Sequence, residues 1–288
     1  KMKISAITNG ISQDYETACQ IMNETGVKYA ELQEAYGKRV EYLTLDDARK
    51  IKALNDQYDI EVASVTTHAF VGIGVGGIEV GDEKYQEQMA LLKNGIEIAK
   101  IVGAKHVRAM CFARQIVMWG KNGADQWNAG GNKAWPKFIE LYRPIAKLAE
   151  EEGISLIVEN GFNGMLTSAY TARRFIEDLG SPNVSVLWDP ANAAWVGDIA
   201  YPNGYEEVKN CLGHVHIKDM LLDPVRSTAE VVAIGRGDLA PYLTRIAKAL
   251  RDDGYDGFVS LENIYRPEGK DYVDGYRIDI ETLKEIFA

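Results

Sequence analysis

The sequence predicts an α/β protein, a single (β/α)8 barrel domain that spans residues 1–288. Eight short apolar runs, typical of buried strands, alternate along the chain with eight amphipathic segments of helical length. Dividing 288 residues among eight units leaves about 36 residues for each strand and its helix, which suits a barrel of this kind. An open doubly wound sheet is the alternative, but the first strand is not followed by the GxGxxG signature of dinucleotide-binding sheets.

Each expected element follows from local residue types. The expected strands are residues 2–8, 28–34, 60–67, 104–111, 154–160, 183–189, 214–219 and 257–263. The helices expected between them are 13–25, 44–57, 82–102, 134–152, 168–180, 204–212, 238–253 and 276–287. Thr44 is a typical helix N-cap, and Gly103, Gly153 and Gly180 follow helices where a left-handed residue ends the last turn.

One long stretch, residues 112–133, fits neither pattern and lies between the fourth strand and its helix. Loops of this length are uncommon unless they are functional. Because the segment carries Trp119 and Trp127, we expect either a lid over the end of the barrel or a packed excursion on the surface.

Composition excludes several classes of protein. Hydrophobic residues make up 46% and charged residues 26%, an ordinary globular balance. The net charge of −10 argues against nonspecific binding to nucleic acid, which needs a basic surface. Three cysteines cannot build a disulfide framework, and we expect neither a signal peptide nor a membrane span because no long apolar stretch is present. These features predict a cytoplasmic protein.

Four consecutive strands of the expected barrel carry polar residues at their ends: Glu159, Asp189, His216 and Glu262. Alternate residues of a strand share a face, so these four belong to one set that points into the barrel, and the interleaved residues are apolar. The carboxyl ends of barrel strands are where function gathers. We therefore expect the four side chains to converge at one mouth of the barrel.

Three carboxylates crowded at one mouth repel each other unless a cation joins them. Three carboxylates and an imidazole form an oxygen-rich site that suits one divalent cation, with Mn²⁺ favoured and Mg²⁺, Co²⁺ or Zn²⁺ also compatible. The alternative for each residue alone is an ordinary hydrogen-bonded polar group at a strand end.

The motifs VENGF (158–162), LWDPANA (187–193), GHVHIKD (213–219) and SLEN (260–263) resemble those of the xylose isomerase-like TIM barrels, the sugar (phosphate) isomerase/epimerase superfamily. The resemblance extends over essentially the whole chain. It implies that Glu159, Asp189, His216 and Glu262 bind one divalent metal, usually Mn²⁺, and that Glu159 and Glu262 also exchange protons with the substrate. Ketose 3-epimerases of this family have a histidine where this chain has Asn192, which argues against 3-epimerase activity on a free ketohexose but not against the metal.

Further residues are expected to contact the substrate or to support the site. His68 stands where family members often have a histidine that contacts substrate, and Lys218 faces inward, where it could hold an anion or form a salt bridge. His214 lies one layer below His216 and is expected to support it. The full set of expected substrate-binding residues is His68, Arg108, Asn192, His214, Lys218 and Trp119.

The metal site favours a sugar isomerase or epimerase that removes a proton next to a carbonyl and passes through a metal-stabilised enediolate. Elimination shares that intermediate, so a lyase of the same superfamily is the alternative: a keto-sugar or inosose dehydratase, or a C-glycoside deglycosidase catalytic subunit. A remote alternative is an apurinic endonuclease, which four histidines and a charge of −10 argue against. A third alternative is a sugar-binding barrel without enzymatic activity. We expect a carbohydrate or polyol substrate, no nucleic-acid or membrane partner, and either a homo-oligomer or a small accessory subunit.

Overall fold

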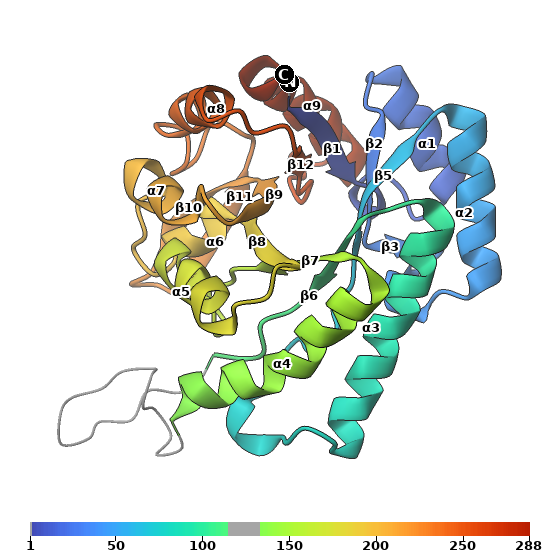
Figure 1. Ribbon diagram of the computed structural model, residues 1–288. Coiled ribbons are helices and arrows are strands. Elements are labelled where there is room, and N and C mark those ends of the chain that lie inside the picture. The colour runs from blue at the N-terminus through green and yellow to red at the C-terminus, as the bar shows by residue number, and fades with distance from the viewer. Residues whose placement is uncertain (1, 115–132) are drawn as a thin grey trace.

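The computed structural model describes residues 2–114 and 133–288, and its strands form a closed parallel barrel (Figure 1). Around the barrel the order is β1-β12-β9-β8-β7-β6-β5-β2. These strands are β1 (Lys3–Ile7), β2 (Tyr29–Leu32), β5 (Glu61–Thr66), β6 (His106–Ala109), β7 (Ser155–Glu159), β8 (Val184–Trp188), β9 (Leu212–Ile217) and β12 (Phe258–Leu261). Because β1 pairs with β12 on one side and with β2 on the other, the sheet has no open edge, and the doubly wound alternative is excluded.

Helices surround the barrel and cover the outer face of its strands (Figure 1). They are α1 (Tyr15–Glu24), α2 (Leu45–Tyr58), α3 (Glu83–Val102), α4 (Ala134–Glu152), α5 (Ala169–Leu179), α6 (Pro190–Ala194), α7 (Tyr205–Val208), α8 (Leu243–Asp252) and α9 (Tyr272–Phe287). Within residues 2–114 and 133–288, no helix is both long enough and apolar enough to cross a membrane.

Two of the expected helices are shorter in the structure. In place of a helix over 204–212, a kinked turn (Ala200–Gly204), in which the backbone of Tyr201 is extended, leads into the four-residue α7. The helix expected over 238–253 begins only at Leu243. Pro241 lacks the backbone N–H that a helix interior requires, so the residues before it form turns instead.

The alternation expected along the strands is confirmed. The apolar set, which includes Leu156, Val186 and Val215, belongs to the continuous core that the strands share with the helices. Ile157 and Leu187 are also buried but lie outside that core cluster, as side chains inside a barrel must. The barrel interior is therefore a separate compartment that is polar toward its mouth.

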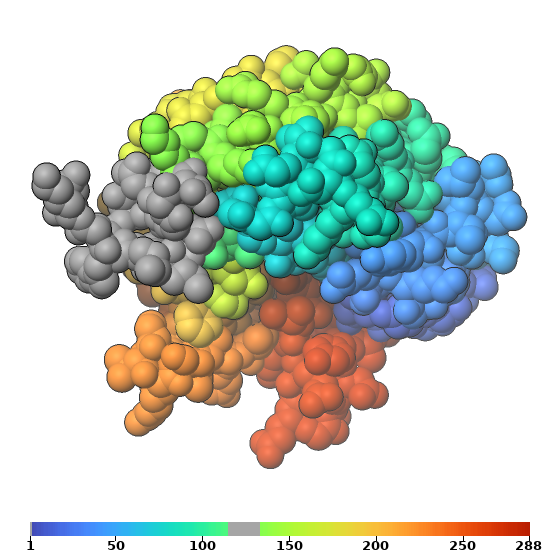
Figure 2. Space-filling view, turned by 90° about the horizontal axis from the view of Figure 1, so that it is seen from below, coloured from blue at the N-terminus to red at the C-terminus, as the bar shows by residue number. Residues whose placement is uncertain are grey.

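Two hairpins accompany the barrel, and the sequence predicted neither. One pairs β3 (Glu34–Ala35) with β4 (Lys38–Arg39), and the other pairs β10 (Asp219–Asp223) with β11 (Thr228–Val232). The second hairpin directly follows β9, so the strand expected over 214–219 ends early, and Asp219 belongs to the hairpin. In Figure 2 the orange segment that contains this hairpin stands out from the body of the molecule.

Candidate metal centre

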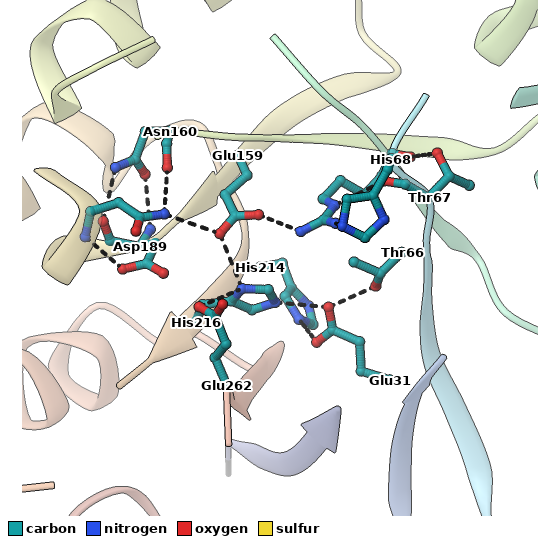
Figure 3. Close-up of polar contacts among 12 residues, drawn as sticks. Glu31, Thr66, Thr67, His68, Glu159, Asn160, Asp189, His214, His216 and Glu262 are labelled. Carbon is teal, nitrogen blue, oxygen red and sulfur yellow. Dashed lines mark hydrogen bonds and ion pairs between the residues drawn. The ribbon is translucent and has the colours of Figure 1, made fainter. Parts of the chain in front are cut away.

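Four side chains from neighbouring strands meet inside one end of the barrel: Glu159, Asp189, His216 and Glu262. One ligand atom from each lies within 4.8 Å of every other. Glu159 ends β7, His216 lies in β9, and Asp189 and Glu262 directly follow β8 and β12. Figure 3 shows Glu159 and His216 directed toward each other, with Glu262 beside them. The structure thus brings together all four residues that the sequence nominated as ligands.

The local chain around Asp189 fixes its carboxylate. Asp189 is the N-cap of α6, and its Oδ1 accepts the Asn192 N–H at 2.9 Å. Asn160 joins the ends of β7 and β8: its Oδ1 accepts the Asp189 N–H, and its Nδ2 donates to the Asp189 carbonyl, both at 2.8 Å. The second carboxylate oxygen, Oδ2, is thereby directed toward the cluster.

Glu159 is held from three directions. Its Oε2 accepts a hydrogen bond from Arg108 Nη1 at 2.5 Å, and its Oε1 lies 3.3 Å from His216 Nδ1 and 3.4 Å from Asn192 Nδ2. Burial alone would raise the pKa of Glu159, but His216 and Arg108 outweigh it and hold the pKa well below its usual range. Glu159 is therefore ionised and restrained.

Lys218 lies among the carboxylates rather than apart from them. Its Nζ is 2.5 Å from Asp189 Oδ2 and 2.5 Å from Glu262 Oε2. Burial opposes the charge of Lys218, but Asp189 and Glu262 raise its pKa above the ordinary value. Burial raises the pKa of Asp189 to about 7, while for Glu262 the ammonium of Lys218 overcomes burial and lowers the pKa. In this arrangement Lys218 neutralises two of the four candidate ligands, as the salt-bridge interpretation expected.

The other residues expected to contact substrate do not all lie beside the cluster. Arg108 and His68 lie together, with Arg108 Nη2 at 3.3 Å from His68 Nε2. Burial and the adjacent Arg108 lower the pKa of His68 to about 3, so this ring is neutral. His214 is fully buried, and its Nε2 contacts Glu31 rather than the space beside the cluster. Trp119, Trp127 and most of the 112–133 segment lie outside the described residues, so its placement stays a prediction.

Glu31, on β2, is a functional candidate that the sequence analysis missed. Its Oε1 lies 2.7 Å from His216 Nε2, its Oε2 lies 2.9 Å from His214 Nε2, and Thr66 Oγ1 donates to Oε1 at 2.7 Å (Figure 3). Burial would raise the pKa of Glu31, but His216 and His214 lower it well below the usual range. A signal was present, because an acidic residue in the middle of the buried run 28–34 needs a partner.

The cluster fits a divalent cation by the chemistry of its donors. Three carboxylates and one imidazole that already meet at one point form a hard, oxygen-rich set. Lys218, in contact with two of them, shows that this point favours positive charge. A cation bound there would leave Glu159 and Glu262 beside it as carboxylates able to accept a proton.

Comparison with known proteins assigns the fold and leaves the reaction open. A family model described as "Xylose isomerase-like TIM barrel" matches residues 19–286. A comparison with curated proteins finds no match.

Solved structures share the fold at low sequence identity. The apo 3-keto-D-glucoside 4-epimerase YcjR from E. coli has a TM-score of 0.74 and 19% identity, over 99% of this chain and 100% of that one. The probable 3-DHS dehydratase AsbF from Bacillus anthracis has a TM-score of 0.72 and 15% identity, over 98% and 99%. A xylose isomerase-like TIM barrel protein from Mycobacterium smegmatis in complex with magnesium has a TM-score of 0.66 and 16% identity, over 100% and 97%.

Proposed function

This chain belongs to the xylose isomerase-like TIM barrel family, and on that premise we propose that it is a divalent-metal-dependent sugar isomerase or epimerase. In this proposal it removes a proton from the carbon next to a carbonyl of a carbohydrate, or of a keto-polyol such as an inosose, and returns it to the same or the neighbouring carbon. Solved structures of the same fold include an epimerase and a dehydratase. Both are compatible with removal of a proton from carbon, so the comparison supports that step but does not distinguish between the two reactions.

One observation carries the proposal: Glu159, Asp189, His216 and Glu262 converge within 4.8 Å of one another. Buried carboxylates are costly unless they are paired. Lys218 and Arg108 pair with these carboxylates, but a buried ion pair often fails to repay the cost of removing its charges from water, so the gathering of three carboxylates at one point argues for a ligand that uses them. A bound divalent cation would supply the positive charge that stabilises an oxygen anion next to the reacting carbon.

Glu262 is the better placed of the two glutamates to take the proton. Its side chain is 24% exposed, whereas that of Glu159 is 6% exposed and is held by Arg108 and His216. Glu262 is also ionised, because Lys218 lowers its pKa. Glu159 on β7 and Glu262 after β12 are separated by β8 and β9 in the barrel, so the two can reach a substrate from different sides.

Arg108 and His68 form the polar wall next to Glu159. Since His68 is neutral, it can donate a hydrogen bond to a sugar hydroxyl or accept one from it, without adding charge to the site. Asn192 already donates to Asn160 and Glu159, so it would act on substrate only through Glu159 or by exchanging one of these bonds.

The proposal is tested by solvent-deuterium exchange. The protein, freed of metal with EDTA and reloaded with Mn²⁺, is incubated in D₂O with a panel of aldoses, ketoses, 3-keto-glycosides and inososes, and each carbon is followed by NMR. We expect deuterium at the carbon next to the carbonyl of one substrate class, with Mn²⁺ and not after EDTA. Exchange that EDTA leaves unchanged, or no exchange with any of these classes, would contradict the proposal. Loss of water from the substrate would assign the site to the lyase alternative instead.

A further inference from the structure

We propose that Glu31 is the positioning residue of the metal centre: its carboxylate fixes the ring of His216 so that Nδ1 is presented to the cation. The inference rests on the proposed metal function and adds a residue that belongs to none of the four candidate ligands. Glu31 comes from β2, which lies on the opposite side of the barrel from β8.

The two ring nitrogens of His216 face different partners. Nδ1 lies 3.3 Å from Glu159 Oε1 and 3.9 Å from Glu262 Oε2, whereas Nε2 lies 2.7 Å from Glu31 Oε1. An ionised carboxylate has only lone pairs to offer, so a nitrogen at 2.7 Å must carry a proton. Nδ1 also faces a carboxylate but at a longer distance, so a cation bound at Nδ1 would displace the proton there while Glu31 keeps the proton on Nε2.

Glu31 is itself fixed as an ionised acceptor. Its oxygens receive hydrogen bonds from three sides, from Thr66 and His216 on Oε1 and from His214 on Oε2. The Glu31 and His214 side chains are completely buried and the His216 side chain is 1% exposed. Because these short contacts already fill the space between Glu31 and the two rings, Glu31 is better explained as an anchor than as a ligand of a second cation. Carboxylates in this position hold the tautomer and raise the basicity of a ligating histidine.

The test compares metal affinity in three proteins by Co²⁺ titration, followed by the visible absorption of the bound ion. Glu31→Gln keeps the shape of the side chain and removes its charge. We expect it to bind Co²⁺ about 10- to 100-fold more weakly than the unmodified protein, with an altered absorption spectrum. Asp279→Asn is the control: Asp279 is a buried carboxylate on α9 that accepts the Ile234 N–H and is not among the clustered ligand atoms. This control should bind Co²⁺ with unchanged affinity and spectrum.

A second measurement needs no variant and so does not depend on how Glu31→Gln folds. In the Zn²⁺-loaded protein labelled with ¹⁵N-histidine, NMR should show His216 with its proton on Nε2 and the metal on Nδ1. A proton on Nδ1, or a Glu31→Gln variant with the affinity and spectrum of the unmodified protein, would overturn the proposal that Glu31 positions His216. If the unmodified protein binds neither Co²⁺ nor Zn²⁺, the proposed metal-dependent function is wrong, and the positioning role of Glu31 is wrong with it.

Discussion

Lys218 shows how the residues of the cluster balance their charges. Its ammonium contacts Asp189 and Glu262, while Arg108 contacts Glu159 and the two histidines contact Glu31. Each of these four carboxylates therefore has a cationic or N–H partner, as buried carboxylates require. A divalent cation at the cluster would compete with Lys218 for the same oxygens, so metal binding should move Lys218 away from at least one of them.

The proton chemistry is tested at Glu262. Glu262→Gln keeps an oxygen for the metal but cannot accept a proton at neutral pH, so we expect most of the metal affinity to remain and turnover to fall by about 10² or more. Asp189→Asn is the matched comparison: its remaining oxygen is used to accept the Asn192 N–H, so the amide nitrogen replaces the oxygen beside the cluster and should weaken metal binding itself. The readout is deuterium wash-in at the substrate carbon together with a metal titration. If Glu262→Gln exchanged deuterium at the unmodified rate, Glu262 would be only a ligand, and the base would be Glu159, His68 or Lys218.

The sequence was sufficient to find the four clustered residues but not Glu31. Glu159, Asp189, His216 and Glu262 could be found because four neighbouring strands end in polar residues of one parity. Glu31 is a single acidic residue in a short strand, and its partners His214 and His216 are more than 180 residues away along the chain, at separations of 183 and 185. Only the closure of the barrel brings them together.

At the scale of elements, the barrel strands were predictable because buried runs bounded by turns repeat eight times. The hairpin β10–β11 was not, because its residues are mostly exposed or half-buried and show no clear apolar alternation. A buried residue, Asp219, ties the hairpin to the loop that follows. Its carboxylate accepts N–H groups from Gly235, Gly237 and Leu239.

The hydrogen bonds that the Asp219 carboxylate accepts should contribute strongly to the stability of the protein. Asp219→Ala leaves four backbone N–H groups without their acceptor, because the carboxylate also accepts the Met220 N–H, and we expect the free energy of unfolding to fall by about 3 kcal/mol. Asp223→Ala, at the exposed turn of the same hairpin, removes an acceptor for the Arg226 N–H and should cost about 1 kcal/mol or less. Urea unfolding of the two variants beside the unmodified protein measures the difference. Equal losses would show that the loop does not depend on Asp219.

At the scale of the whole molecule, the closed barrel follows from the number and alternation of the units, and the family comparison agrees with it. The sequence predicts less directly which side chains meet at the barrel mouth. Glu31 on β2 reaches His216 on β9, and Arg108 on β6 reaches Glu159 on β7, so the site combines residues from most of the circumference. Strand parity predicts which side chains point inward, but which of them meet depends on register and tilt, which the sequence pattern does not specify.

A crystal of the protein grown with Mn²⁺ tests most directly whether Glu159, Asp189, His216 and Glu262 form one divalent metal site. Anomalous scattering at the manganese edge should show one ion about 2–2.6 Å from an oxygen or nitrogen of each of the four residues. Lys218 should then have left at least one of its two carboxylate partners. A map without a peak among these four side chains, with Lys218 still bridging Asp189 and Glu262 at saturating Mn²⁺, would show that these residues do not form a metal site.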